Sequence, residues 1–211
     1  GYDSAGVAVL EQNGRIAIRR DVGKLKNLGV LLGQSPLKGE LGIGHTRWST
    51  HGEPSQRNAH PHIGMNGHVV VVHNGIVENF LSLREELAAE GVQFSSETDT
   101  EVIVQLVERY VESGAAFETA VRQTLVQLEG ANAVVVMSVD QPDRLICARL
   151  GNAGGITLGI GQEEMFVASD IPAILEYTRV MFFLENLQWA IVARHSFRFS
   201  DLEGNPIEPE L

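Results

Sequence analysis

Residues 45–54 carry the densest group of chemically active side chains in this 211-residue sequence. They read His-Thr-Arg-Trp-Ser-Thr-His-Gly-Glu-Pro, which brings together a guanidinium, an indole, two imidazoles, a carboxylate and three hydroxyls. Residues 41–44 before them alternate apolar side chains with glycine, as a short strand does, and Gly52 and Pro54 break any regular element. The pattern predicts a strand that ends at Arg47 and opens into a polar loop, the kind of segment on which binding sites are built.

Asn74 and Gly75 follow directly on the apolar strand expected over residues 68–73. A side-chain amide and a glycine N–H at the end of a strand can direct two donors at one point, which is how an oxyanion hole is made. An Asn-Gly pair is also a common ordinary turn. The sequence at this position leaves both interpretations open.

Asp99 is expected in the first turn of a helix, after a capping box formed by Thr98 and Glu101. A carboxylate there could simply interact favourably with the helix dipole, or it could receive the ammonium group of a substrate. Arg47 is the natural counterpart, because a guanidinium binds a carboxylate through two parallel hydrogen bonds. Together the two residues predict a clamp for the charged head of a free α-amino acid.

Six of the seven histidines lie between positions 45 and 73, which raises the question of a metal site. Their spacing includes no H-E-x-x-H motif and no cysteine partner, so we expect no metal. His68 and His73 flank a run of four valines, and we expect both to be hydrogen-bonded residues at the ends of a strand.

The composition is that of an ordinary globular protein, with 44% hydrophobic residues and a formal net charge of −11. The negative charge argues against nucleic acid or an anionic membrane as the main partner. No apolar run is long enough for a membrane span. The single cysteine, Cys147, permits no internal disulfide and fits a reducing cytosol, and we expect it to be buried in a strand.

The periodicity changes along the chain from strands to helices and back to strands. Strands joined by an Asn-Gly turn are expected over residues 5–10 and 15–20, and the period becomes two again from residue 131 onward. The expected helices cover residues 24–32 and 77–90, a segment beginning near Thr98, a segment from 117 to 128, and a short one over 171–177. This order predicts an α+β fold of two antiparallel sheets with helices packed outside them.

Three ordered motifs resemble the glutaminase domain of the glucosamine-6-phosphate synthases, which are class II glutamine amidotransferases. They are residues 45–54, the run His-Asn-Gly-Ile-Val-Glu-Asn at 73–79 and the run Ser-Glu-Thr-Asp-Thr-Glu at 96–101. The opening Gly-Tyr-Asp-Ser-Ala-Gly matches as well, and the resemblance extends to about residue 184. It implies a four-layer αββα sandwich of the N-terminal-nucleophile hydrolase type, which in this chain lacks its first strand and helix.

The resemblance also implies roles for the residues singled out above. Arg47 would bind the α-carboxylate of glutamine and Asp99 its α-ammonium group. The side chain of Asn74 and the backbone N–H of Gly75 would form the oxyanion hole.

The segment 48–54 would be a loop that closes over the substrate and excludes water. Within it, Thr50 and His51 would help to hold glutamine, and Trp48 would act at the gate toward a second domain. The family's usual Gly-Ser-Pro-Leu is replaced here by Leu-Gly-Asn-Ala-Gly-Gly at 150–155, so no role is carried over to that segment. Residues 187–189 also depart from the family, which tends to have an acidic turn there.

The implied activity is the hydrolysis of glutamine to glutamate and ammonia, with no cofactor. The ammonia would convert fructose 6-phosphate to glucosamine 6-phosphate in a full-length cytoplasmic enzyme. On this view residues 1–211 form one glutaminase domain, incomplete at its N-terminus. Its partners would be L-glutamine and a C-terminal sugar-phosphate isomerase domain, absent here, through which the enzyme would form homo-oligomers.

The family's nucleophile is an N-terminal cysteine, and this chain has none, because its only cysteine is Cys147. We therefore expect the 211-residue chain to be inactive as it stands. Three alternatives stay open: the glutaminase domain of another enzyme such as amidophosphoribosyltransferase, a glutamine-binding domain without catalysis, and a metal hydrolase built on the histidines.

Overall fold

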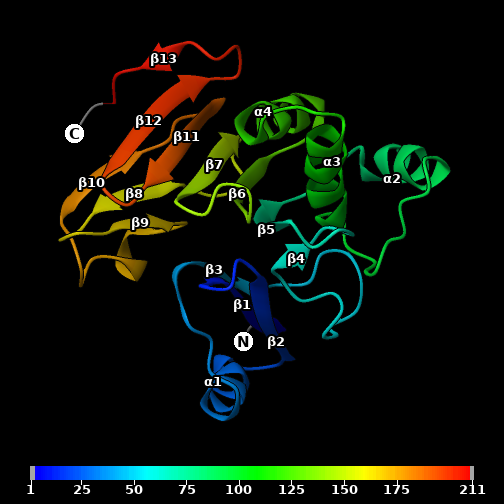
Figure 1. The fold of residues 1–211 in the computed structure, drawn as a ribbon, viewed down its shortest axis with the longest axis horizontal. Coiled ribbons are helices and arrows are strands. Elements are labelled where there is room, and N and C mark those ends of the chain that lie inside the picture. The colour runs from blue at the N-terminus through cyan, green and yellow to red at the C-terminus, as the bar shows by residue number, and fades with distance from the viewer. Residues whose placement is uncertain (1–2, 210–211) are drawn as a thin grey trace.

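The computed structural model of this chain describes residues 3–209 (Figure 1). Its helices are α1 (Leu25–Gln34), α2 (Phe80–Ala89), α3 (Glu101–Glu112), α4 (Phe117–Gln127) and the 3-10 helix η1 (Ile171–Ala173). Its strands are β1 (Ser4–Glu11), β2 (Ile16–Val22), β3 (Gly39–Arg47), β4 (His62–Ile63), β5 (Val69–Gly75), β6 (Asn132–Ser138), β7 (Arg144–Leu150), β8 (Thr157–Ile160), β9 (Met165–Ala168), β10 (Val180–Phe183), β11 (Gln188–Ala193), β12 (Ser196–Asp201) and β13 (Pro206–Ile207).

A seven-stranded antiparallel sheet forms the centre of the molecule, in the order β13-β12-β11-β7-β6-β5-β4. The continuous apolar run of β5 is explained by its place in this sheet, because both faces of the strand are covered. Val69 and Val71 point into a core shared with α3 and α4, whereas Val70 and Val72 point into a core shared with β1 and β3. Helices α2, α3 and α4 therefore lie on one face of the sheet and further strands cover the other, while α1 packs against β1 and β2.

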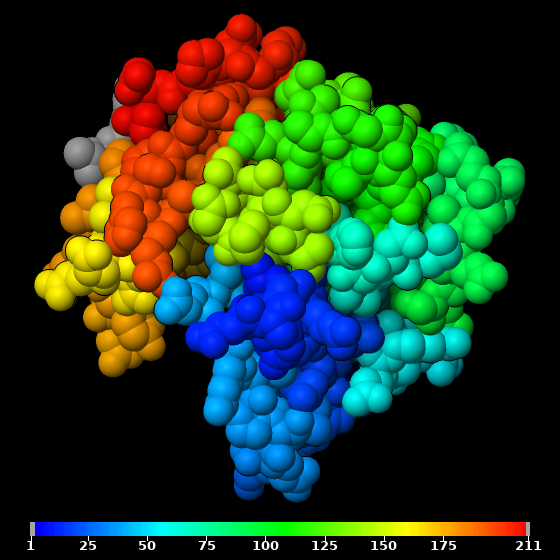
Figure 2. Space-filling model, viewed as in Figure 1, coloured from blue at the N-terminus to red at the C-terminus, as the bar shows by residue number. Residues whose placement is uncertain are grey.

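Those further strands form two small antiparallel sheets, β2-β1-β3 and β10-β8-β9. The layered α+β arrangement agrees with the prediction, but the second sheet is divided into two parts. β3 and β9 are both edge strands, and they line opposite sides of a cleft of about 350 Å³. In Figure 2 the blue β1–β3 unit with α1 projects from the lower edge of the molecule, apart from the yellow and orange β8–β10 unit.

The expected start of α3 is wrong by several residues. The helix begins at Glu101, and its N-cap residue Thr100 makes no side-chain capping hydrogen bond. The Glu101 carboxylate instead accepts hydrogen bonds from the backbone N–H groups of Ser95 and Ser96, at 2.8 and 2.6 Å. The same carboxylate that suggested a capping box thus fixes the loop before the helix.

Two other helices are shorter than expected. α2 begins at Phe80 rather than near residue 77, and the N–H of Val77 before it donates to the side chain of Asp99. Only the first three residues of the segment 171–177 are helical. No helix in the described part of the chain is long and apolar enough to cross a membrane.

Candidate active site

Arg47 is the last residue of β3, as the sequence predicts, and its side chain is 3% exposed. Its Nη1 donates to the Oγ of Ser49 at 3.0 Å, and its Nη2 donates to the backbone carbonyls of His51 and Gly52. Burial lowers the pKa of the guanidinium, and the neighbouring Asp3 and Asp99 oppose that shift. A guanidinium stays charged in proteins, so the loop is folded around a buried positive charge.

Asp99 supplies the opposite charge close by. Asp99 is 3% exposed, and its Oδ2 accepts a hydrogen bond from the backbone N–H of Val77 at 2.9 Å. Its Oδ1 lies 3.8 Å from Nδ1 of His51, beyond hydrogen-bond distance. The structure thus brings Arg47, His51 and Asp99 together, and one oxygen of the buried carboxylate has capacity for another donor.

Asn74 is oriented by His45, for which the sequence predicted no role. Its Oδ1 lies 2.8 Å from Nε2 of His45, on β3. Burial lowers the pKa of His45, so the ring is neutral near pH 7. Because an amide oxygen only accepts, Nε2 carries the proton, and the Nδ2 donors of Asn74 face the cleft that this residue lines. No spacing in the sequence connects His45 with Asn74, since they lie on strands of different sheets.

Gly75 has a φ of +121°, a conformation that other residues rarely adopt. A Cβ at this position would lie 2.0 Å from the carbonyl oxygen of Ala131. The N–H of Ile76 donates to Ala131 and that of Val139 donates to His68, so the even-numbered residues of β5 make the hydrogen bonds to β6. The N–H of Gly75 therefore points away from β6, as an oxyanion donor at the end of the strand requires.

The predicted residues of the loop 48–54 differ in how far they are exposed to solvent. Trp48 is 76% exposed and Thr50 is also exposed, whereas His51 is half-buried with its ring against Phe80. Asn58, for which the sequence predicted no role, holds the C-terminal end of the loop by hydrogen bonds. Its Nδ2 donates to the carbonyl of Glu53 at 2.9 Å, and its Oδ1 accepts from the N–H of Glu97 at 2.9 Å.

Three buried histidines, His60, His62 and His73, lie behind this site together with the half-buried His45. The rings of His60 and His73 both approach the hydroxyl of Thr100, at 3.0 and 2.9 Å. Burial lowers the pKa of His62 to about 3 and that of His73 to about 4.

These rings are therefore neutral structural groups at pH 7. Within residues 3–209 no three His, Cys, Asp or Glu side chains are grouped as metal ligands. His73 is a hydrogen-bonded residue on the strand as predicted, while His68 is exposed.

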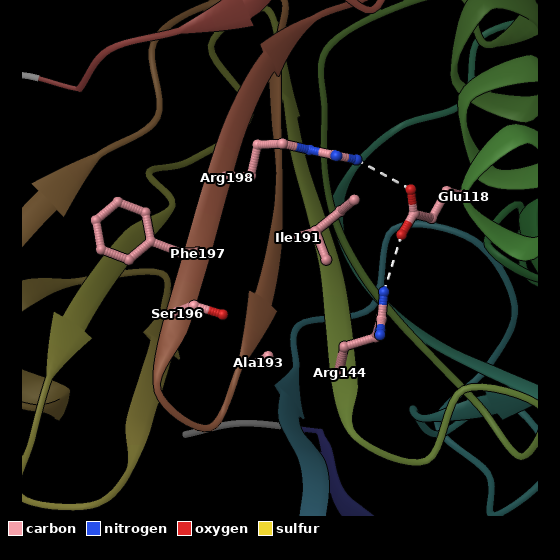
Figure 3. A pocket seen from close by; sticks show the side chains of 7 residues that line it. All are labelled: Glu118, Arg144, Ile191, Ala193, Ser196, Phe197 and Arg198. Carbon is pink, nitrogen blue, oxygen red and sulfur yellow. Dashed lines mark hydrogen bonds and ion pairs between the residues drawn. The ribbon is translucent and has the colours of Figure 1, made fainter.

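Cys147 lies in β7 and is fully buried, as predicted, and burial raises the pKa of its thiol to about 12. It cannot act as a nucleophile from that position, because the thiolate is the reactive form. A second hollow, of about 170 Å³, lies between α4 and β7, β11 and β12 (Figure 3). There Glu118 accepts hydrogen bonds from Arg144 and Arg198, both at 3.0 Å, so these charges satisfy one another.

Comparison with known sequences adds to this geometry. The family described as glutamine amidotransferase domain matches residues 45–176. Proteins named glutamine–fructose-6-phosphate aminotransferase (isomerizing) are 47% identical in Caldanaerobacter subterraneus subsp. tengcongensis and 44% identical in Clostridium perfringens, both over all 211 residues. The chain spans about a third (34%) of the length of each of these relatives.

Solved structures share the fold at lower identity. The glutamine phosphoribosylpyrophosphate amidotransferase of B. subtilis, complexed with ADP and GMP, superposes with a TM-score of 0.81 at 23% identity, over 98% of this chain and 44% of its own. A glutamine aminotransferase class-II domain protein from Silicibacter pomeroyi gives 0.62 at 17% identity, over 93% and 90%. These likenesses confirm the predicted N-terminal-nucleophile type of α+β fold. From the match over residues 45–176 and this shared fold, the chain belongs to the glutamine amidotransferase domain family.

Proposed function

We propose that this chain is the glutamine-binding unit of a glutamine–fructose-6-phosphate aminotransferase. The observation that carries the proposal is the pairing of two buried opposite charges, Arg47 and Asp99, on either side of His51. The α-carboxylate of glutamine binds the guanidinium, and its α-ammonium group binds the free Oδ1 of Asp99. Such a clamp rejects ligands that lack either charge, because a buried group is then left without a partner.

The side-chain amide of glutamine reaches the cleft at Asn74 and Gly75. Nδ2 of Asn74, held by His45, and the N–H of Gly75 stabilise the negative charge that develops on the amide oxygen during attack. The loop 48–54 closes over the bound substrate and excludes water, so that ammonia passes to an acceptor. Trp48, Thr50 and His51 are the residues that make this cover. The names of the relatives suggest fructose 6-phosphate as the acceptor.

The attacking thiolate comes from outside residues 3–209 in this proposal. The support is the cleft between β3 and β9, which are edge strands of the two small sheets in the described part of the chain, and Asn74 is among the residues that line it. One further strand there would join the two small sheets into one. Residues 1–211 are then an incomplete glutaminase domain of a longer cytosolic protein, whose remaining part carries the sugar-phosphate isomerase activity and the oligomer contacts.

Calorimetric titration of the 211-residue chain with L-glutamine, combined with an ammonia assay, tests this function. We expect binding without turnover. Arg47→Lys should weaken binding about tenfold, because an ammonium group cannot make the two parallel hydrogen bonds. Absence of glutamine binding would overturn the proposed function. Release of ammonia by this chain would overturn the placement of the nucleophile instead.

A further inference from the structure

The turn 151–155 lies directly against Asn74 and Gly75, the pair proposed to form the oxyanion hole. A Cβ added to Gly75 would lie 2.7 Å from the Cβ of Ala153. A Cβ added to Gly154, whose φ is +141°, would lie 3.8 Å from both Cβ and Nδ2 of Asn74. The turn therefore forms a wall of the site beside the two groups that would contact the amide of a bound glutamine.

Arg149, near the end of β7, holds this turn in place. Its Nη2 donates to Oδ1 of Asn152 at 3.3 Å, and its Nη1 donates to the carbonyl of Leu184 at 3.0 Å. Its own carbonyl accepts from the N–H of Leu187 at 2.8 Å. A second tie is made by Asn186, whose Oδ1 accepts from the N–H of Gly151 at 2.6 Å. The turn is thus fastened to the connection between β10 and β11.

Packing alone does not explain an arginine at this position. Its Nε is buried and has no hydrogen-bond partner among residues 3–209, and a buried donor without a partner destabilises a fold. The guanidinium links two chain segments, the turn 151–155 and the connection between β10 and β11, in addition to the tie made by Asn186. That link ends one residue away from the Ala153 and Gly154 pair that touches the oxyanion site.

We propose that Arg149 is a positioning residue: through Asn152 it presses the turn 151–155 against Asn74 and Gly75, and so fixes the geometry in which they bind the side-chain amide of glutamine. This inference rests on the proposed function. Arg149 is separate from the clamp formed by Arg47 and Asp99, so its loss should affect the amide end of the substrate and leave the amino-acid head unaffected.

Two ligands distinguish an effect at the amide end of the site from an effect at the amino-acid head. L-Glutamine and L-norvaline share the charged head, but norvaline has no side-chain carbonyl. We expect Arg149→Met to weaken glutamine binding about threefold to tenfold, the range for one lost hydrogen bond, and to leave norvaline binding within about twofold. Asn152→Ala removes only the acceptor and should act in the same direction. It carries the test if Arg149→Met does not fold.

Arg144→Met is the matched control, because Arg144 begins the same strand but binds Glu118 at the hollow in Figure 3, away from the turn. It should leave the binding of both ligands unchanged. Equal weakening of both ligands by Arg149→Met would show a general structural role and overturn the inference, as would no effect from either variant. If the unaltered chain binds neither ligand, the proposed function itself is wrong.

Discussion

Two buried carboxylates near the start and the middle of α3 differ in how far their hydrogen-bonding capacity is used. Glu108 is 4% exposed and accepts from three backbone N–H groups, those of Asn66, His68 and Val69, at 2.8 to 3.1 Å. Asp99 is 3% exposed, but among residues 3–209 it accepts from only one backbone N–H, that of Val77. The two residues are almost equally buried, so burial does not distinguish them.

The difference separates a structural acid from a candidate ligand-binding acid. A buried charge that is fully hydrogen-bonded stabilises its surroundings, whereas one with unused capacity costs stability until a donor arrives. Glu108 ties the β4–β5 turn to α3, and both of its oxygens accept hydrogen bonds from that turn, which occupy three of its roughly four acceptor sites. Asp99 keeps one oxygen for an ammonium group, and the nearby loop carries the charge that would bind the other end of that ligand.

The largest effect is expected from Glu108→Ala. It leaves three backbone donors of the β4–β5 turn without an acceptor, so the free energy of unfolding should fall by about 4 kcal/mol. Urea unfolding followed by circular dichroism measures the loss. Glu112→Ala, one turn further along the same helix and exposed, should change stability by less than about 0.5 kcal/mol. Equal losses from the two variants would remove the structural half of the comparison.

Asp99→Asn should have the opposite profile. An asparagine oxygen can still accept from Val77, so stability should change by less than about 1 kcal/mol. The affinity for L-glutamine should fall at least about 30-fold, or about 2 kcal/mol, because the ammonium group loses its counter-charge. Calorimetric titration of the unaltered chain and of Asp99→Asn with L-glutamine measures this loss of affinity. Unchanged affinity would show that Asp99 is a second structural acid like Glu108.

A smaller effect sharpens the comparison by extending it to a buried base. The folded pKa of His62 is about 3 against an ordinary 6.5, so the unfolded state binds the proton more readily. Its contribution to stability is complete above pH 6.5 and is lost as the pH falls toward 3. Lowering the pH from 6.5 to 5.5 should cost about 1 kcal/mol more in the unaltered chain than in His62→Gln.

Unfolding in urea at the two pH values gives this difference. His195→Gln, at an exposed position, should retain the full pH dependence of the unaltered chain. A His62→Gln variant with that same dependence would contradict the assignment of His62 as a buried neutral base.

The sequence was informative where function depends on neighbours along the chain. Glycines at 42 and 44 and the polar run after them predicted a strand that ends at Arg47, and the valines before Asn74 predicted an apolar strand, which the structure shows to be covered on both faces. Local signals failed where one side chain had two possible partners. Glu101 suggested a capping box with Thr98, yet its carboxylate accepts hydrogen bonds from Ser95 and Ser96, a few residues further back along the chain.

No pattern in the sequence indicated the contacts between residues that lie far apart along the chain. His45 and Asn74 are 29 residues apart, and Glu108 meets the turn it stabilises about 40 residues away. Each of these residues has an ordinary alternative role, a strand histidine or a helix-surface glutamate, that its own neighbours in sequence cannot exclude. Only the folded arrangement decides between them.

The two tryptophans differ in exposure, and this difference determines what each contributes to the fluorescence of the protein. Trp189 is 5% exposed and its indole N–H donates to the carbonyl of Asp201 at 2.6 Å, so its emission is fixed by the core. Trp48 is 76% exposed on the loop that would cover the substrate. Fluorescence from Trp48 therefore responds to the polarity around that loop, while Trp189 serves as an internal reference. Closure of that loop over a ligand, as proposed, would therefore be visible in the protein's own fluorescence without any added dye.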